Sequence, residues 1–325
     1  MNLGLDLGYS AVKVVAGQRR KTFPSVVGTP DIGRFSLGEQ EECIVLAAPP
    51  HVLVGRGAMA QSRFVNRRED RAWIESAEYY HLFLAALTEI TSATAADLLL
   101  VTGLPVAFYG DREGLGNRLL GTHKVTREGW HAQTFRVAEC RVMPQPFGAL
   151  LAEALDDGGR IADQDLATGP VGVIDVGGKT TNLLSVRRLA EIGRQTESVS
   201  MGAWEIVRAV RTYLADRCPS LELRDHQVID AIVARQVRYY GEPVDLAPVV
   251  DAVLEPMVSQ VIAQATQLRN GGAGLDAILV AGGGALLLGP RIKAQFRHAR
   301  ISADPVFANA LGYCKLAQRL GSGAN

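Results

Sequence analysis

Two apolar segments of this chain share one pattern, in which short apolar stretches flank a turn that carries an aspartate and a glycine. The first turn, Leu5-Asp6-Leu7-Gly8-Tyr9-Ser10, lies within residues 1–16, and the second, Ile174-Asp175-Val176-Gly177-Gly178-Lys179-Thr180-Thr181, within residues 171–186. Short apolar runs interrupted by glycine predict buried strands joined by a tight turn. Because the pattern occurs twice, 169 residues apart, the sequence predicts a duplicated architecture.

The spacing of apolar residues distinguishes helices from strands in the rest of the chain. In residues 76–90, the side chains of Tyr79, Phe83, Leu84 and Leu87 recur at helical spacing. The other segments that we expect to be helical are 111–120, 146–155, 202–215, 225–236, 245–267, 290–298 and 305–320. The segments with strand character are 3–7, 11–16, 22–27, 43–47, 51–54, 98–102, 125–127, 134–138, 141–143 and 276–280. Strands and helices in two similar halves predict two α/β domains with a cleft between them, divided at the polar stretch 158–170.

The composition is ordinary for a globular protein and argues against several kinds of partner. Of 325 residues, 47% are hydrophobic and 21% are charged, and the formal net charge is zero. Bulk attraction to DNA or to an anionic membrane is therefore not expected. No apolar stretch approaches the ~20 residues that span a bilayer, and the start of the chain lacks the basic segment of a signal peptide. We expect a cytoplasmic protein that binds neither membrane nor nucleic acid directly.

The cysteines and histidines show no pattern of a metal or redox site. Cys43, Cys140, Cys218 and Cys314 lie far apart without a Cys-x-x-Cys pair, and the six histidines lack ligand spacing. We expect the cysteines to be reduced core thiols, as is usual in a cytosolic protein.

The two acidic turns carry the residue types that a nucleoside triphosphate requires. Glycines leave backbone N–H groups accessible to phosphate oxygens, and hydroxyl and lysine side chains add donors and positive charge. Magnesium prefers one or two carboxylates together with water, so we expect Asp6 and Asp175 to hold its waters from opposite sides. The predicted nucleotide-binding residues of the two turns are Asp6, Gly8, Tyr9, Ser10, Lys13, Asp175, Gly177, Gly178, Lys179, Thr180 and Thr181.

A third glycine-rich element follows a buried strand. Leu279-Val280-Ala281 runs into Gly282, Gly283 and Gly284 before a helical segment. Consecutive glycines let a planar base or a ribose approach the backbone closely. One acidic glycine turn is common in proteins, but two copies together with this third element indicate a nucleotide site.

The order of these motifs resembles the actin/sugar-kinase/heat-shock-chaperone ATPase superfamily. Asp6-x-Gly8 resembles its first phosphate loop, Asp175-x-Gly177-Gly178-x-Thr180-Thr181 its second, and Val280 to Ala285 its adenosine motif. Met143-Pro144-Gln145-Pro146-Phe147-Gly148-Ala149 and Phe307-Ala308-Asn309-Ala310-Leu311-Gly312-Tyr313 resemble its two connecting motifs. Lys13, seven residues past Asp6, matches the offset of the phosphate-contacting lysine in actins.

Within this superfamily the chain is most similar to the ParM/StbA-type bacterial actins of plasmid segregation. The residues that suggest it are Gly103-Leu104-Pro105, the helical segment 109–120 and Phe307-Ala308-Asn309-Ala310-x-Gly312. The resemblance implies an actin-like fold of two ribonuclease-H-like domains with a nucleotide cleft between them. Domain I would comprise residues 1–160 and 305–325, with an inserted subdomain at about 30–72. Domain II would comprise residues 161–304, with a helical subdomain at about 201–274.

The resemblance also implies an ATPase whose hydrolysis is coupled to filament assembly. Gln145 would orient the attacking water, while Asp6 and Asp175 would hold magnesium and Asp175 would polarise that water. Many plasmid-segregation actins carry an acidic residue seven positions beyond the second-loop aspartate, where this chain has Asn182. An amide orients water but accepts a proton less readily, which predicts slower turnover or a more persistent filament.

The expected ligands are ATP, or GTP, with magnesium. The expected partners are further copies of the chain and an adaptor protein that links the filament to plasmid DNA. Two alternatives stay open: a non-polymerising nucleotide-binding scaffold of the pilus or division type, and a small-molecule kinase of the same fold. For the kinase, Asp111 and Asp97 are the candidates, and neither lies in a convincing motif. The contacts of the base also stay open among Glu205, Arg208, Gln227 and Arg235.

Overall fold

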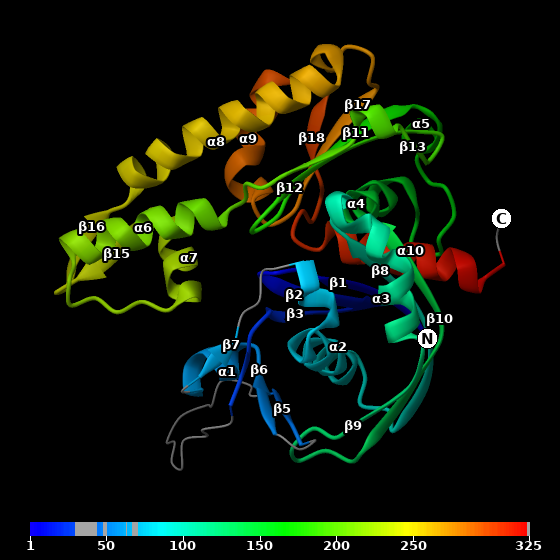
Figure 1. Cartoon of the computed structure of the whole chain (residues 1–325). Coiled ribbons are helices and arrows are strands. Elements are labelled where there is room, and N and C mark those ends of the chain that lie inside the picture. The colour runs from blue at the N-terminus through cyan, green and yellow to red at the C-terminus, as the bar shows by residue number, and fades with distance from the viewer. Residues whose placement is uncertain (30–43, 48–50, 63, 67–70, 324–325) are drawn as a thin grey trace.

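Two β-sheets lie on either side of a central pair of helices (Figure 1). The computed structural model describes residues 1–29, 44–47, 51–62, 64–66 and 71–323. The first sheet has the order β3-β2-β1-β8-β10-β9, with β1 (Asn2–Leu7), β2 (Ala11–Ala16), β3 (Arg19–Pro24), β8 (Ala95–Leu104), β9 (Gly121–Val125) and β10 (Gln133–Pro144). The second has the order β13-β12-β11-β17-β18, with β14 also paired to β12. Its strands are β11 (Pro170–Val176), β12 (Thr181–Arg187), β13 (Ala190–Glu191), β14 (Glu197–Val199), β17 (Ala277–Ala281) and β18 (Ala299–Ile301).

The two sheets repeat one topology. In the first, β1 pairs antiparallel with β2 and parallel with β8, and in the second, β11 pairs antiparallel with β12 and parallel with β17. The register is repeated as well, because Asp6 lies opposite Lys13 and Asp175 lies opposite Asn182. The predicted α/β class with two duplicated domains is confirmed.

Helix α2 (Ala77–Ile90) covers one face of the first sheet, as its periodicity predicts. It begins at Ser76, whose hydroxyl accepts the Tyr79 N–H at 3.1 Å, and Leu82, Phe83 and Leu87 are buried in the first core. The other helices are α3 (Arg112–Leu119), α4 (Gln145–Ala154), α5 (Gln164–Thr168), α6 (Trp204–Arg217), α7 (Asp225–Ala234), α8 (Ala247–Leu268), α9 (Ala285–Gln295) and α10 (Ala308–Gly321). Short 3-10 helices span Arg71–Glu75, Val106–Asp111, Gly193–Gln195 and Asn270–Gly272.

Each of the two central helices, α4 and α10, follows one large sheet along the chain but packs on the other. Helix α4 follows β10 of the first sheet, yet its Phe147 and Leu150 join the core of β11, β12 and β17. Helix α10 follows β18 of the second sheet and packs on β1 and β8. The two helices cross at Gly148 and Gly312, where a Cβ on Gly312 would overlap the Gly148 carbonyl. Only glycine fits at this crossing.

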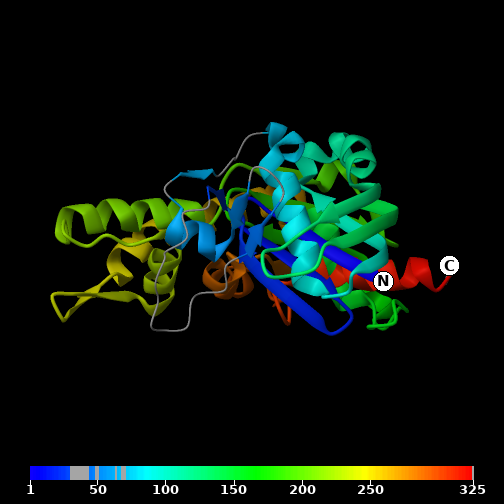
Figure 2. The same ribbon diagram turned by 90° about the horizontal axis from the view of Figure 1, so that it is seen from below.

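Each half carries a smaller appendage. The first consists of β5 (Ile44–Leu46), β6 (Val52–Val54), β4 (Val27–Gly28) and β7 (Val65–Asn66), in that sheet order, with α1 (Arg56–Gln61). Residues 30–43, 48–50, 63 and 67–70 of the predicted insertion, Cys43 among them, lie outside the described part of the chain. The second is an elongated arm of α6, α7 and α8 that ends in the hairpin β15 (Gln236–Tyr239) and β16 (Glu242–Asp245) (Figure 2). The domain boundaries given above stay predictions.

Some element boundaries differ from those predicted. The segments expected as two strands, 134–138 and 141–143, form the single strand β10, which has an irregularity between Val137 and Glu139. Helix α9 begins at Ala285 rather than at Pro290 and contains this proline in its interior, where proline is usually unfavourable. The hairpin β15–β16 was not predicted.

The cysteines and the helices of the described residues bear on two other expectations, that of reduced thiols and that of no membrane span. Cys140, Cys218 and Cys314 are free thiols there, the last two buried. Within the same residues, none of the helices combines the length and apolarity needed to cross a bilayer.

Candidate functional site

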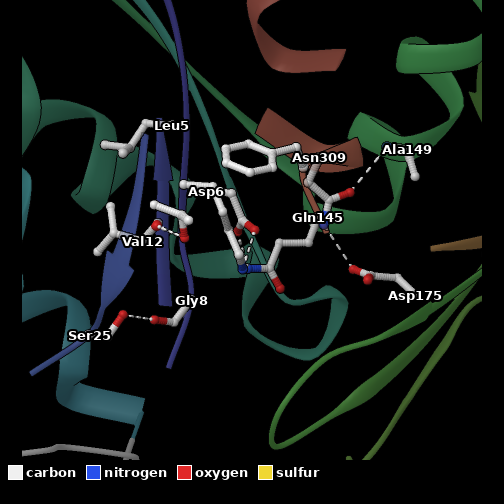
Figure 3. Close-up of polar contacts among 12 residues, drawn as sticks. Leu5, Asp6, Gly8, Val12, Ser25, Gln145, Ala149, Asp175 and Asn309 are labelled. Atoms are coloured by element: carbon white, nitrogen blue, oxygen red, sulfur yellow. Dashed lines mark hydrogen bonds and ion pairs between the residues drawn. The ribbon is translucent and has the colours of Figure 1, made fainter. Parts of the chain in front are cut away.

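The two acidic turns face each other across a cleft between the halves of the molecule. The first turn follows β1 and the second follows β11, and the glycine triplet after β17 closes a third side. Gln145 at the start of α4 and Asn309 at the start of α10 also line the cleft, so the crossing helices form its floor (Figure 3).

Asp6 is buried at the end of β1, and two side chains hold its carboxylate. Lys13 Nζ lies 3.0 Å from Oδ2, and Gln145 Nε2 donates to Oδ1 at 3.3 Å. The Gln145 backbone is fixed in turn by the Tyr313 hydroxyl, which donates to its carbonyl at 3.1 Å. The negative charge of Asp6 is therefore balanced by one lysine, and the Gln145 side chain is oriented by that carboxylate.

Asp175 is buried at the end of β11 and is only 4% exposed. Asn309 Nδ2 donates to its Oδ2 at 3.0 Å, and Asn309 Oδ1 accepts the Ala149 N–H at 3.1 Å (Figure 3). Burial raises the pKa of Asp175 to about 6, and the Asp6 carboxylate adds to this rise against the opposing effects of Asn309 and Lys13. In the described part of the chain, the charged side chains that line the cleft are thus two carboxylates, Asp6 and Asp175, and two lysines, Lys13 and Lys179.

Asn182 lies directly across the strand pair from Asp175 and is buried. Its Oδ1 accepts a hydrogen bond from the Ser198 hydroxyl on β14. An amide whose oxygen is used in this way presents N–H donors on its other side. Asn182 therefore contributes a neutral donor to the lining of the cleft.

The three glycines after β17 have different roles. Gly282 has a φ of +84°, and a Cβ there would overlap the Asp175 carboxylate. A Cβ on Gly284 would overlap the Val176 side chain. Around Gly283 there is open space. Gly282 and Gly284 are thus required for packing on the second turn, and Gly283 is the position that leaves room for a ligand.

The two turns touch each other beside the cleft. Trp204 Nε1, from the first residue of α6, donates to the Ser10 hydroxyl of the first turn. Gly178 lies against both side chains, and a Cβ on it would overlap Ser10 Oγ. Lys179 Nζ of the second turn lies 5.1 Å from the centre of the Tyr9 ring of the first. These contacts join the halves next to the space that a ligand would occupy.

All but one of the predicted site residues line the cleft. Those brought together are Asp6, Gly8, Tyr9, Ser10, Lys13, Gln145, Asp175, Gly177, Gly178, Lys179, Thr180, Asn182, Gly282, Gly283 and Gly284. Thr181 is the exception, because it is fully buried and its hydroxyl donates to the Met201 carbonyl at 2.8 Å. As the first residue of β12, Thr181 faces the core, whereas its neighbour Thr180 in the turn faces the cleft.

The sequence reasoning missed the apolar side of the cleft. Its lining includes the aliphatic residues Ile206, Val207, Ile229, Ile232, Val233, Leu286 and Leu287. Their helical spacing was the available signal, but this spacing is also that of an ordinary core face. The polar residues considered for a base do not line the cleft: Glu205 pairs with Arg208, Gln227 caps α7 and Arg235 pairs with Asp251 at 3.0 Å.

The carboxylates fit a magnesium ion that takes most of its ligands from water and phosphate. Among the described residues, no three metal-binding side chains form a cluster, so the protein would supply only Asp6 and Asp175. Magnesium sites of this kind use one or two carboxylates. Burial raises the pKa of Asp175, and a divalent cation held beside this carboxylate would favour its charged form.

Two family models together match most of the sequence. Residues 4–148 match the N-terminal domain of actin-like proteins, and residues 173–294 match the C-terminal domain of the archaeal actin homologue, MreB-like. Among curated proteins, none matches the sequence significantly.

Solved structures of similar fold cover nearly the whole chain. The crystal structure of Ta0583, an archaeal actin homologue, is 23% identical with a TM-score of 0.81, and the match covers 98% of this chain and 99% of that one. A non-polymerisable quadruple mutant of pCBH ParM is 21% identical with a TM-score of 0.81, over 98% of both chains. A ParM from Clostridium botulinum, seen in a 15-stranded filament, is 20% identical with a TM-score of 0.79, over 98% of this chain and 100% of that one.

Proposed function

Because the chain belongs to the actin-like ATPase superfamily, we propose that it binds ATP, or GTP, with magnesium in the cleft and hydrolyses it. We further propose that the chain polymerises and that hydrolysis controls the lifetime of the filament. An adaptor protein would attach the filament to plasmid DNA or to another cargo in the cytoplasm.

The observation that carries the proposal is the opposition of the two acidic turns. Asp6 and Asp175 come from equivalent positions of two duplicated hairpins and line one cleft. Glycine backbone at positions 8, 177 and 178 accompanies them, as phosphate groups require. The aliphatic side of the cleft supplies a surface on which a purine base packs without needing charged partners.

The side chains have distinct roles in this proposal. When bound, magnesium neutralises phosphate charge and aligns the reacting groups. Lys13 balances Asp6 and adds positive charge beside the phosphates. Gln145 is held through its Nε2 by Asp6, so its side-chain oxygen is the acceptor that orients a water for attack. Asp175 polarises that water from the second turn.

The proposed nucleotide is supported by one relative, because the structure of Ta0583 is also known in complex with ADP, with 23% identity and a TM-score of 0.79.

The proposed filament is supported by another relative, the Clostridium botulinum ParM, which assembles into a 15-stranded filament. The formal net charge of zero on this chain opposes self-association little.

The kinase alternative has less support. Asp97 forms an exposed ion pair with Arg136, in which its side chain is 73% exposed, and it does not line the cleft. Asp111 lines a small separate cavity behind the first turn. A scaffold that binds nucleotide without polymerising would share every feature of the cleft, so only assembly separates it from the leading proposal.

Light scattering at micromolar protein, with and without ATP and magnesium, tests the proposed function. We expect assembly upon addition of nucleotide, followed by phosphate release. Asp175→Ala should lose magnesium-dependent hydrolysis, whereas the matched variant Asp97→Ala should keep it. Full turnover in Asp175→Ala would show the site to be wrongly assigned, and binding without assembly would favour the scaffold. Hydrolysis only with an added sugar or acid would favour the kinase.

A further inference from the structure

We propose that Trp204 is a positioning residue that orients the Ser10 hydroxyl toward the nucleotide's phosphates. The inference rests on the proposed function, because it concerns the same cleft. It goes further by assigning a role to a residue of the helical arm that no motif of the sequence indicates.

The chemistry of the contact fixes its direction. An indole Nε1–H donates and has no acceptor, so Ser10 Oγ must be the acceptor in the bond with Trp204. The single hydroxyl proton of Ser10 then cannot point toward Trp204. Because Ser10 lines the cleft, the proton is left to donate to a phosphate oxygen.

Backbone contacts hold Trp204 in place for this task. The N–H groups of Ala203 and Trp204 donate to the carbonyls of Gly177 and Gly178 at 3.0 and 2.9 Å. A Cβ on Gly202 would overlap the Gly178 carbonyl, so the start of α6 lies directly on the second turn. The indole therefore has a fixed position relative to the second turn and reaches across to the first.

The glycine at position 178 makes this three-way contact possible. A side chain there would overlap Ser10 Oγ and the Trp204 ring. Gly178 therefore has a second role besides exposing its backbone. In the proposed arrangement Trp204 donates a hydrogen bond to Ser10, and Ser10 donates one to a phosphate oxygen. These two hydrogen bonds form in sequence only when the two halves are close enough for the turns to touch.

A double-mutant cycle tests the inference. Trp204→Phe keeps the ring and removes the N–H, and Ser10→Ala removes the hydroxyl. We expect each variant to weaken binding of a fluorescent Mg–ATP analogue about fivefold, the usual effect of one lost hydrogen bond. If Trp204 acts through Ser10, the double variant should bind no more weakly than Ser10→Ala alone.

The controls separate positioning from folding and from the proposed function. Trp130→Phe makes the same substitution outside the cleft and should bind like the wild type. Arg127 Cζ lies 4.8 Å from the centre of the Trp130 ring there. Thermal unfolding of each variant reports whether the fold is kept. If the losses of affinity multiply in the double variant, or if Trp204→Phe binds as tightly as the wild type or more tightly, the inference is overturned while the proposed function stands. A wild type that bound no Mg–nucleotide would overturn the proposed function itself.

Discussion

Asn309 joins the floor of the cleft to Asp175 by donating to the carboxylate while accepting a backbone N–H from α4. One side chain of α10 therefore touches both the second turn and the helix that carries Gln145. The carboxylate that is proposed to polarise water and the residue that is proposed to orient it share this support.

Replacement of Asn309 should cost stability even without a ligand. Asn309→Ala leaves the Ala149 N–H and one Asp175 oxygen without these partners in a buried place, which predicts a loss of about 1–3 kcal/mol. Urea unfolding measures it. Asn117→Ala on the exposed face of α3 is the matched control and should change stability little. Equal effects of the two variants would refute a supporting role for Asn309.

The raised pKa of Asp175 makes the stability of the ligand-free protein depend on pH. An unfolded aspartate titrates near 3.9, and the folded group titrates at about 6, so the folded state binds the proton more tightly. The stabilising effect of this proton is complete below about pH 4 and is lost as the pH rises through about 6.

Asp175→Asn should remove this dependence. At pH 7 the variant should unfold with a free energy roughly 2–3 kcal/mol higher than the wild type, because one pKa unit corresponds to ~1.4 kcal/mol. Near pH 4 the difference should vanish. Denaturant titrations across this range measure it, and a difference that did not change with pH would contradict the burial argument.

The glycine crossing of α4 and α10 should tolerate no side chain. Gly312→Ala forces a methyl group into the Gly148 carbonyl, and overpacking of this kind costs about 1–3 kcal/mol. Gly114 in α3 has nothing within 4 Å of a built Cβ, so Gly114→Ala should instead stabilise its helix by up to about 1 kcal/mol. Thermal unfolding of both variants checks the opposite signs.

Asn182→Asp tests whether the amide slows turnover. The aspartate would keep an acceptor for Ser198 and add a base opposite Asp175. We expect phosphate release several-fold faster than in the wild type, and a filament that disassembles sooner. Ser198→Ala removes the hydrogen bond to position 182 without adding a base, and it should leave phosphate release close to the wild-type rate. Fast hydrolysis in the wild type that is unchanged in the variant would count against the hypothesis.

Most residues of the two acidic turns could be predicted from the sequence, because those that lie together in the cleft are also close along the chain. Asp6 and Lys13 lie in one hairpin, as do Asp175 and Asn182, and the strand register alone brings each pair together. Thr181 was predicted to bind the nucleotide but faces the core, because a shift of one residue at a strand end turns a side chain from the cleft to the core. Trp204 and Asn309 depend on contacts between segments far apart in the chain, which periodicity does not report.

Helices α4 and α10, which cross at Gly148 and Gly312, each cover the sheet of the opposite half. Neither half is therefore complete by itself. A cut in 158–170 would give an N-terminal piece without α10 over its first sheet and a C-terminal piece without α4 over its second. Each piece would expose an apolar surface that only the other piece covers. The two large sheets therefore belong to a single unit of folding, and the two pieces, made separately, should regain structure only when mixed.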